Sequence, residues 1–188
     1  MTKLNLKKIV DNLIDTFLYA GKISLELRVK GLIKKIKSDN TPVSNGDLEV
    51  NKIITDKIKE VTPHIPIISE ETLDNRKIKN LKDFWLIDPI DGTYDYINDL
   101  EEFTINAGLI INNNPVAGLI YAPSKKRMFY SYGDNLAFEI VNGETVRLDC
   151  SRYATKNEIK FVSYSNKIKP EIEKIHKILN VKSFTRMK

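Results

Sequence analysis

The apolar residues in the first sixty positions recur every three to four residues, which is the spacing of an amphipathic helix. The pattern predicts one helix from residue 4 to about residue 31, bent or ended by Gly21 and Gly31. It predicts a second helix after Ser44 or Asn45, since either side chain can cap a helix. Both should pack on a core through apolar stripes. The stripes are formed by Ile9, Val10, Leu13, Ile14, Phe17 and Leu18, and by Val50, Ile53, Ile54 and Ile58.

From residue 64 onward the apolar residues come in short runs, which is typical of strands. Two of these runs, residues 64–69 and 84–87, are each followed by acidic residues. The later runs are joined by short polar turns, including the hairpin signal Asn142-Gly143. They predict an antiparallel meander that packs on the two helices. Its strands are expected at 103–111, 116–122, 127–132, 136–141 and 144–148.

The pattern changes again near Lys156, where it predicts a strand, a helix and a strand at 161–163, 169–179 and 181–184. We therefore expect an α+β protein with a first domain at residues 1–155 and the beginning of a truncated α/β domain at residues 156–188. Because one such unit leaves a sheet uncovered, its apolar residues should remain exposed. These residues are Ile159, Phe161, Ile172, Ile175, Ile178 and Val181.

The composition is that of a soluble globular protein, with 41% hydrophobic and 29% charged residues. We find no apolar run of membrane-spanning length and no secretion signal, and the single Cys150 excludes an internal disulfide. These features indicate a cytoplasmic protein, with a peripheral position at the inner membrane face as the alternative. The net charge is +5, but no basic stretch is interleaved with aromatic residues. This pattern favours a small polyanion over a nucleic acid as the binding partner. The oligomeric state stays open between monomer and homodimer.

The candidate chemistry centres on residues 85–93, Trp-Leu-Ile-Asp-Pro-Ile-Asp-Gly-Thr. Asp88 is expected at the end of a buried strand that Pro89 closes, and Asp91 follows closely enough for both carboxylates to converge. Gly92 and Thr93 can open a turn or helix whose free amides attract phosphate. Two carboxylates beside such amides suit a divalent cation shared with a phosphate. The alternative is structural, because Asp-Pro and Asp-Gly are common turn pairs.

Two further acids fall at the ends of predicted elements. Glu70 follows the strand at 64–69, and Asp47 lies near the start of the second helix. Asp47 also has a structural interpretation as a helix cap favoured by the helix dipole. A set of oxygen ligands suits Mg²⁺ rather than Zn²⁺, since neither Cys nor His is nearby in the sequence.

Three of these stretches carry a resemblance. Residues 85–93, Ser69-Glu70-Glu71 and residues 39–47 resemble three motifs of the inositol monophosphatase superfamily. The resemblance implies a layered αβαβα sugar-phosphatase fold and a Mg²⁺-dependent, lithium-sensitive phosphomonoesterase. Residues 37–43, 102–106 and 118–123 are most similar to the CysQ branch, the 3'(2'),5'-bisphosphate nucleotidases. That branch implies a hydrolase of sulfur metabolism whose partner is a small phosphorylated nucleotide.

The resemblance also implies a role for each matching residue. Glu70, Asp88, Asp91 and the carbonyl of Ile90 would bind Mg²⁺, with Asp88 bridging two ions. The substrate-binding set would consist of Glu70, Ile90, Asp91, Gly92 and Thr93, the last two through their backbone amides. Asp47 would accept a hydrogen bond from the Thr93 hydroxyl, and this catalytic pair would act with Glu70 on the attacking water.

One family motif, Trp-Asp-x-x-Ala-Gly, has no match, because the only tryptophan is Trp85. The resemblance implies that its Asp completes the second metal site, so we expect a truncated chain that is weakly active at best. The expected reaction converts 3'-phosphoadenosine 5'-phosphate to AMP and phosphate by a metal-activated water. The alternatives are an inositol-1-phosphate or other sugar phosphatase, and an inactive remnant. A haloacid-dehalogenase-type enzyme is disfavoured, since Pro89 and Ile90 separate acids that such enzymes space by one residue.

Overall fold

A computed structural model describes residues 4–37, 41–72, 81–149, 159–163 and 167–186. The chain forms two compact units, Met1–Leu148 and Asp149–Lys188, and each is described by itself. Within the described residues no helix is long and apolar enough to cross a membrane. Cys150 lies outside the described residues.

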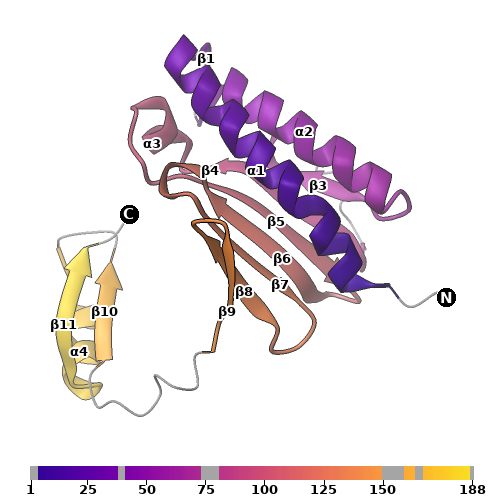
Figure 1. Cartoon of the computed structure of the whole chain (residues 1–188). Coiled ribbons are helices and arrows are strands. Elements are labelled where there is room, and N and C mark those ends of the chain that lie inside the picture. The colour runs from indigo at the N-terminus through magenta and orange to yellow at the C-terminus, as the bar shows by residue number, and fades with distance from the viewer. Residues whose placement is uncertain (1–3, 38–40, 73–80, 150–158, 164–166, 187–188) are drawn as a thin grey trace. The chain divides into compact units, whose positions relative to one another are not determined.

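Two long helices, α1 (Leu6–Lys30) and α2 (Asn45–Val61), run side by side over one face of a sheet (Figure 1). The Asn5 side chain caps α1 by accepting the Lys8 amide, and Gly31 ends the helix with a positive φ of 97°. Gly21 lies within α1 and does not end it. Ser44 caps α2. Both predicted helices are therefore confirmed.

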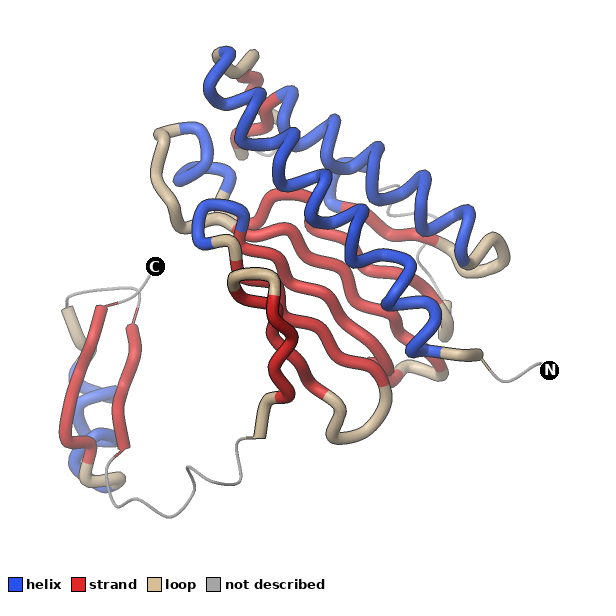
Figure 2. The backbone as a smooth tube through the Cα atoms, viewed as in Figure 1, coloured by secondary structure: helices blue, strands red, loops and turns tan. Residues whose placement is uncertain are grey.

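The sheet has seven strands in the order β3-β4-β5-β6-β7-β8-β9 (Figure 2). The first pair, β3 (Ile67–Ser69) and β4 (Phe84–Asp91), is parallel, and all the following pairs are antiparallel. The meander is confirmed, and Asn142-Gly143 forms its last hairpin with two positive φ angles. Its strands are β5 (Thr104–Ile111), β6 (Asn114–Ala122), β7 (Arg127–Tyr132), β8 (Ala137–Val141) and β9 (Glu144–Arg147).

The two faces of this sheet differ. The face under α1 and α2, called the covered face, holds the core, in which Trp85, Ile87 and Leu119 are at most 1% exposed. The Trp85 indole donates to the Thr62 hydroxyl at the end of α2, at 3.0 Å. The opposite face, called the open face, carries the alternate residues, and its Leu86 is 52% exposed. Burial of each large core side chain contributes about 1.5–3 kcal/mol, so stability comes chiefly from the covered face.

Strand β4 departs from the prediction at Pro89, because the strand continues to Asp91. In the ladder with β5, Asp88 pairs with Asn106 and Asp91 pairs with Thr104. Three steps along β4 therefore match two steps along β5, so β4 holds one extra residue there, which is a β-bulge. Proline is tolerated at a bulge because the ladder is already interrupted. The expectation that Pro89 closes the strand was wrong.

The remaining short elements of the first unit lie around one end of β4. Before α2, a short hairpin that was not predicted from the sequence pairs β1 (Lys34–Ile36) with β2 (Pro42–Ser44). A 3-10 turn η1 (Glu70–Thr72) follows β3, a short helix α3 (Thr93–Ile97) follows β4, and a second turn η2 (Pro123–Lys125) follows β6.

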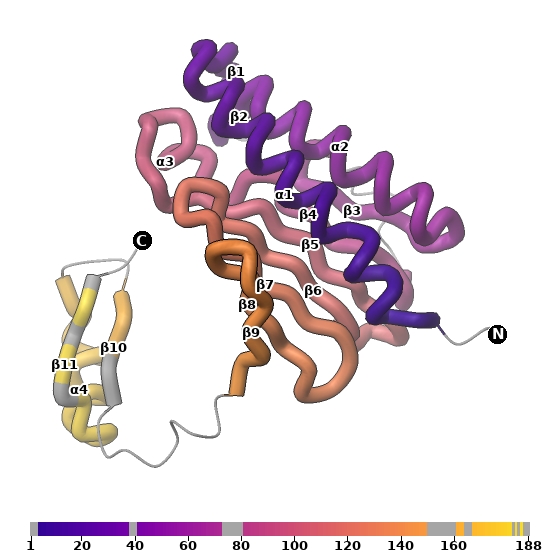
Figure 3. Tube along the Cα trace, viewed as in Figure 1, coloured from indigo at the N-terminus to yellow at the C-terminus, as the bar shows by residue number. Residues whose placement is uncertain are grey.

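The second unit is a strand, a helix and a strand (Figure 3). Strands β10 (Ile159–Ser163) and β11 (Val181–Arg186) are parallel, and α4 (Pro170–Ile178) connects them, as predicted. No residue of α4 is buried, and Ile175 and Ile178 are 48% and 81% exposed. The expected exposure is confirmed for these two residues, whereas Phe161, Ile172 and Val181 are partly buried. The structure describes the backbone of Ile159 but not its side chain.

Candidate active site

The predicted acids come together where β3 and β4 end. These strands are parallel neighbours with Ser69 beside Ile87, so Glu70, which follows β3, comes next to Asp88 of β4. Asp47 approaches from the first turn of α2. Glu70, Asp91 and Asp47 all act electrostatically on Asp88, and Glu70 also lies within hydrogen-bonding reach of it. We call Asp47, Glu70, Glu71, Asp88 and Asp91 the acid cluster.

Asp88 is the least satisfied member of the acid cluster. Its Oδ1 is buried and has no hydrogen-bond partner among the described residues. Burial, followed by the charges of Glu70 and Asp91, raises the pKa of Asp88 from 3.8 to about 7. A buried carboxylate oxygen without a partner is costly, because it has lost its hydration. Asp88 is thus poised to accept a cation or a proton.

Asp47 uses its two carboxylate oxygens for different tasks. Oδ2 accepts hydrogen bonds from the Ser44 amide at 2.7 Å and the Ser44 hydroxyl at 2.6 Å, which forms a capping box at the start of α2. Oδ1 lies 3.1 Å from the Thr93 hydroxyl oxygen. The structure therefore supports both the capping interpretation and the predicted contact with Thr93. The cap fixes the carboxylate and so aims its free oxygen at Thr93.

The Thr93 hydroxyl stands between two acceptors. Besides Asp47, the carbonyl oxygen of Ile90 lies 3.0 Å away. A hydroxyl has one proton, so it donates to one acceptor at a time and keeps its lone pairs for a further donor. Predicted residues Ile90 and Thr93 are therefore in direct contact, and Thr93 can accept a hydrogen bond from a water.

Glycines at two positions allow α3, which begins at Thr93, to lie beside the start of α2. Gly92 has a φ of 88°, and a Cβ there would lie 2.7 Å from the Glu102 carbonyl oxygen. A Cβ on Gly46 would lie 2.3 Å from the Tyr96 hydroxyl oxygen. That hydroxyl donates to the Ser24 carbonyl of α1 at 2.7 Å, which ties α3 to the long helices. The short helix is thus held rigidly beside the start of α2.

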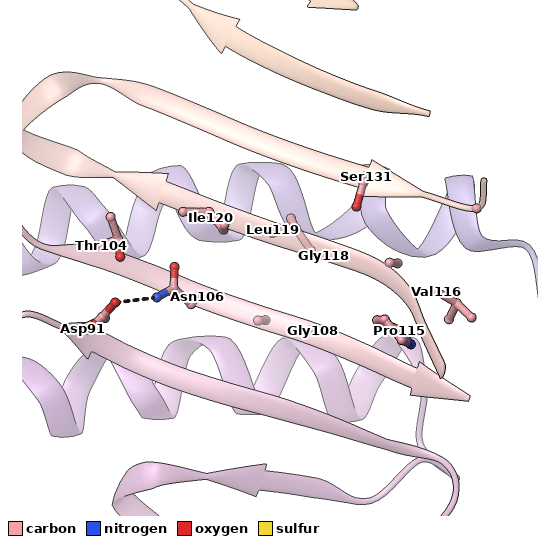
Figure 4. Close-up of a pocket in the computed structure, with 13 residues that line it drawn as sticks. Asp91, Thr104, Asn106, Gly108, Pro115, Val116, Gly118, Leu119, Ile120 and Ser131 are labelled. Atoms are coloured by element: carbon pink, nitrogen blue, oxygen red, sulfur yellow. Dashed lines mark hydrogen bonds between the residues drawn. The ribbon is translucent and has the colours of Figure 1, made fainter. Parts of the chain in front are cut away.

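Two residues near the acids were missed by sequence reasoning. Lys37, which follows β1, forms ion pairs with Glu70 at 3.3 Å and with Glu71 at 2.8 Å. Asn106 donates to Asp91 Oδ2 at 3.4 Å (Figure 4). Lys37 was noted only as part of the stretch 37–43, without a role, and the β1–β2 hairpin that delivers it was not predicted. Asn106 was noted only as part of a strand, although its pairing with Asp88 follows once the β4–β5 register is known.

A shallow hollow of about 590 Å³ extends from Asp91 along the open face. Figure 4 shows Asp91, Thr104, Asn106 and Ile120 toward one end of it and Gly118 and Ser131 toward the other. Its floor is flat beside Gly108 and Gly118, which carry no side chains. A group bound by the acids could therefore extend onto an apolar surface with few polar contacts.

The chemistry of the acids fits a hard divalent cation. Asp88 Oδ1 is an orphaned buried oxygen, and its neighbours are further carboxylates, which are the ligands that Mg²⁺ prefers. Across residues 4–37, 41–72, 81–149, 159–163 and 167–186, no three Asp, Glu, His or Cys side chains are already arranged as a metal-binding group. The metal roles of Glu70, Asp88, Ile90 and Asp91 stay predictions.

Comparison with known proteins shows which family the chain belongs to. The sequence profile described as "Inositol monophosphatase family" matches residues 6–188. The chain belongs to the inositol monophosphatase family. The predicted resemblance is thereby confirmed, since the family match includes every residue of the acid cluster.

Family members known by sequence and by structure agree with this assignment. The 3'(2'),5'-bisphosphate nucleotidase CysQ of Haemophilus influenzae is 34% identical over 144 residues, which are 76% of this chain and 51% of that protein. The same-named protein of Buchnera aphidicola is 36% identical over 132 residues, 69% of this chain and 50% of that protein. The chain spans about half the length of the curated relatives it matches. The crystal structure of CysQ from Bacteroides thetaiotaomicron shares the fold, with a TM-score of 0.64 at 23% identity over 96% of this chain and 72% of that chain.

Proposed function

We propose that the protein is a Mg²⁺-dependent phosphomonoesterase that hydrolyses 3'-phosphoadenosine 5'-phosphate to AMP and phosphate. The observation that carries the proposal is the orphaned Asp88 oxygen among Glu70, Asp91 and Asp47, beside the Asp47–Thr93 hydrogen bond. The substrate class is supported by the relatives that are named 3'(2'),5'-bisphosphate nucleotidases.

The cation would be held by the carboxylates of Glu70, Asp88 and Asp91 and by the carbonyl oxygen of Ile90. When bound, Mg²⁺ lowers the pKa of water and offsets negative charge on a phosphoryl group. The Ile90 carbonyl already contacts Thr93, so residues for the cation and residues for the water adjoin each other.

The chain's own groups would position the water and the phosphate. Asp47 is buried and held by Ser44, so its Oδ1 can keep the Thr93 hydroxyl oriented. The hydroxyl can then accept a hydrogen bond from the water and relay its proton toward Asp47. The backbone amides of Gly92 and Thr93 would bind phosphate oxygens. The remainder of the nucleotide would lie along the hollow that begins at Asp91.

Two alternatives remain as outcomes of the test. An inositol-1-phosphate or other sugar phosphatase would use the same acids on a smaller alcohol. An inactive remnant would bind the metal weakly or not at all and would show no turnover, since the family's Trp-Asp-x-x-Ala-Gly motif has no match within the 188 residues. We also propose that residues 1–155 form one domain, which carries the acids, and that residues 156–188 are the beginning of a second, α/β domain.

The test is phosphate release by the 188-residue chain from 3'-phosphoadenosine 5'-phosphate, inositol 1-phosphate and fructose 1,6-bisphosphate. We expect slow, Mg²⁺-dependent and Li⁺-inhibited release that is fastest with the nucleotide and is abolished in Asp88→Asn. The exposed Asp56→Asn is the matched control for removal of one carboxylate. Faster release from inositol 1-phosphate would favour the sugar phosphatase. Absence of phosphate release from every substrate would favour the remnant.

A further inference from the structure

The side chain of Lys37 places a positive charge beside the acid cluster. The Lys37 ammonium lies 2.8 Å from Glu71 Oε1 and 3.3 Å from Glu70 Oε1, and its side chain is 20% exposed. The residue follows β1, and its backbone amide donates to the Thr41 carbonyl at 2.8 Å. Lys37 is therefore anchored through its backbone while its ammonium reaches the acids.

The two glutamates that share Lys37 are not equivalent. The Glu71 side chain is 6% exposed, so loss of its ion pair would leave a nearly buried charge without compensation. The Glu70 side chain is 44% exposed and makes the longer contact. Its ion pair is the weaker one, because solvent screens it and can replace it. Glu70 is also the glutamate whose charge acts most strongly on Asp88.

We propose that Lys37 is a counter-cation of the acid cluster that stays bound to Glu71 whether or not a metal is present. The divalent cation, when it binds, replaces Lys37 as the partner of Glu70. The inference rests on the proposed metal site and adds a residue that sets how tightly this site binds. In the metal-free chain, Lys37 partly neutralises carboxylates that would otherwise repel one another. When a divalent cation binds, Glu70 turns to it, and the Glu71 anchor keeps the displaced ammonium nearby.

A double-variant cycle tests the exchange by Mg²⁺ titration calorimetry at fixed pH and ionic strength. Lys37→Met removes the competitor, so its Kd for Mg²⁺ should fall by about three- to tenfold, the size expected for coupling within a partly exposed ion pair. Glu71→Gln removes the anchor and leaves Lys37 to Glu70 alone, so the Kd should rise by about threefold or more. In the double variant the effect of Glu71→Gln should vanish, because it acts through Lys37.

Matched variants separate this exchange from general charge effects. Lys59→Met removes one lysine twelve residues along α2 from Asp47, about 18 Å away, and should leave the Kd unchanged. Lys37→Arg retains the charge and should retain metal-free stability. If Lys37→Met unfolds without metal, its thermal unfolding is followed with Mg²⁺ added first, and recovery of the wild-type unfolding temperature is expected.

Displacement itself is observed by NMR after reductive ¹³C-methylation of the lysines. The resonance absent from Lys37→Arg identifies Lys37, and it should shift when Mg²⁺ is added. An unshifted resonance, an unchanged Kd in Lys37→Met, or an equal effect of Glu71→Gln with and without Lys37 would each overturn the inference while leaving the proposed function intact. Absence of Mg²⁺ binding in every variant would overturn the metal site and the proposed function with it.

Discussion

The covered and open faces of the sheet are made by alternate residues of the same strands, yet they serve different purposes. On β4, Trp85 and Ile87 point under the helices and are at most 1% exposed, whereas Leu86 between them is 52% exposed. On β6, Leu119 is fully buried and the adjacent Ile120 is 48% exposed. Hydrophobic residues occur on both sides, so hydrophobicity alone does not tell which side contributes stability.

The open face differs most where it meets the acids. Asp88 is in register with Asn106 and continues the row of Leu86, and its Oδ1 is without a partner in the described part of the chain. Asp47, which reaches the acids from the helix side, accepts hydrogen bonds on both oxygens. The helix side of the molecule therefore fixes geometry, and the open side leaves a carboxylate available for binding.

The largest expected effect lies on the covered face. Trp85→Ala should lower the free energy of unfolding by about 3–5 kcal/mol, because it opens a large cavity and removes the hydrogen bond to Thr62. Its neighbour Leu86→Ala, on the open face, should lower it by about 1 kcal/mol or less. Guanidinium chloride unfolding measures both. Equal losses would mean that the open face is also covered in solution.

The next effect concerns the Asp47 contact between the two sides. Asp47→Asn should reduce phosphate release by about a hundredfold or more, since an amide cannot take a proton from Thr93. Its stability should change by about 1 kcal/mol at most, because the amide oxygen can still cap the helix. Ser44→Ala is the matched variant, which weakens the cap by about 1 kcal/mol with a smaller effect on turnover. Full activity in Asp47→Asn would leave Asp47 with its capping role alone.

The smallest effect is a pH dependence on the open side. The pKa of Asp88 is raised from 3.8 to about 7, so the folded chain retains a proton that the unfolded chain releases. The contribution of Asp88 to the free energy of unfolding is then full below about pH 4 and is lost as pH rises toward 7. The loss should be about 2 kcal/mol, which is roughly half the value implied by the full shift, because Asp88 is only partly buried. Unfolding in EDTA should show that the wild type loses stability from about pH 4 to pH 7, whereas Asp88→Asn should not show this loss. If the wild type instead gained stability relative to the variant over this range, the raised pKa of Asp88 would be refuted.

The helices, the meander and the grouping of acids at strand ends could be predicted from the sequence, because each depends on local spacing. Pro89 misled the prediction, since a proline ends most strands and only the partner strand reveals a bulge. Lys37 could not be foreseen, because its contact depends on a hairpin and on a glutamate 34 residues away. The two roles of Asp47 could be proposed but not separated, since only the three-dimensional structure shows which oxygen contacts which partner.

The bulge in β4 works as a phase shift in the side-chain alternation. If the same residues alternated regularly without a bulge, Ile90 would fall on the same side as Asp88, and Asp91 would point into the core. With it, Pro89 and Ile90 are both buried in succession, and Asp91 returns to the side of Asp88, opposite Thr104. The number of residues between the two acids therefore matters more than the identity of those residues. Substitution of Ile90 by another apolar residue should be tolerated, whereas insertion of one further residue between Asp88 and Asp91, with the bulge unchanged, would turn one acid away from the other.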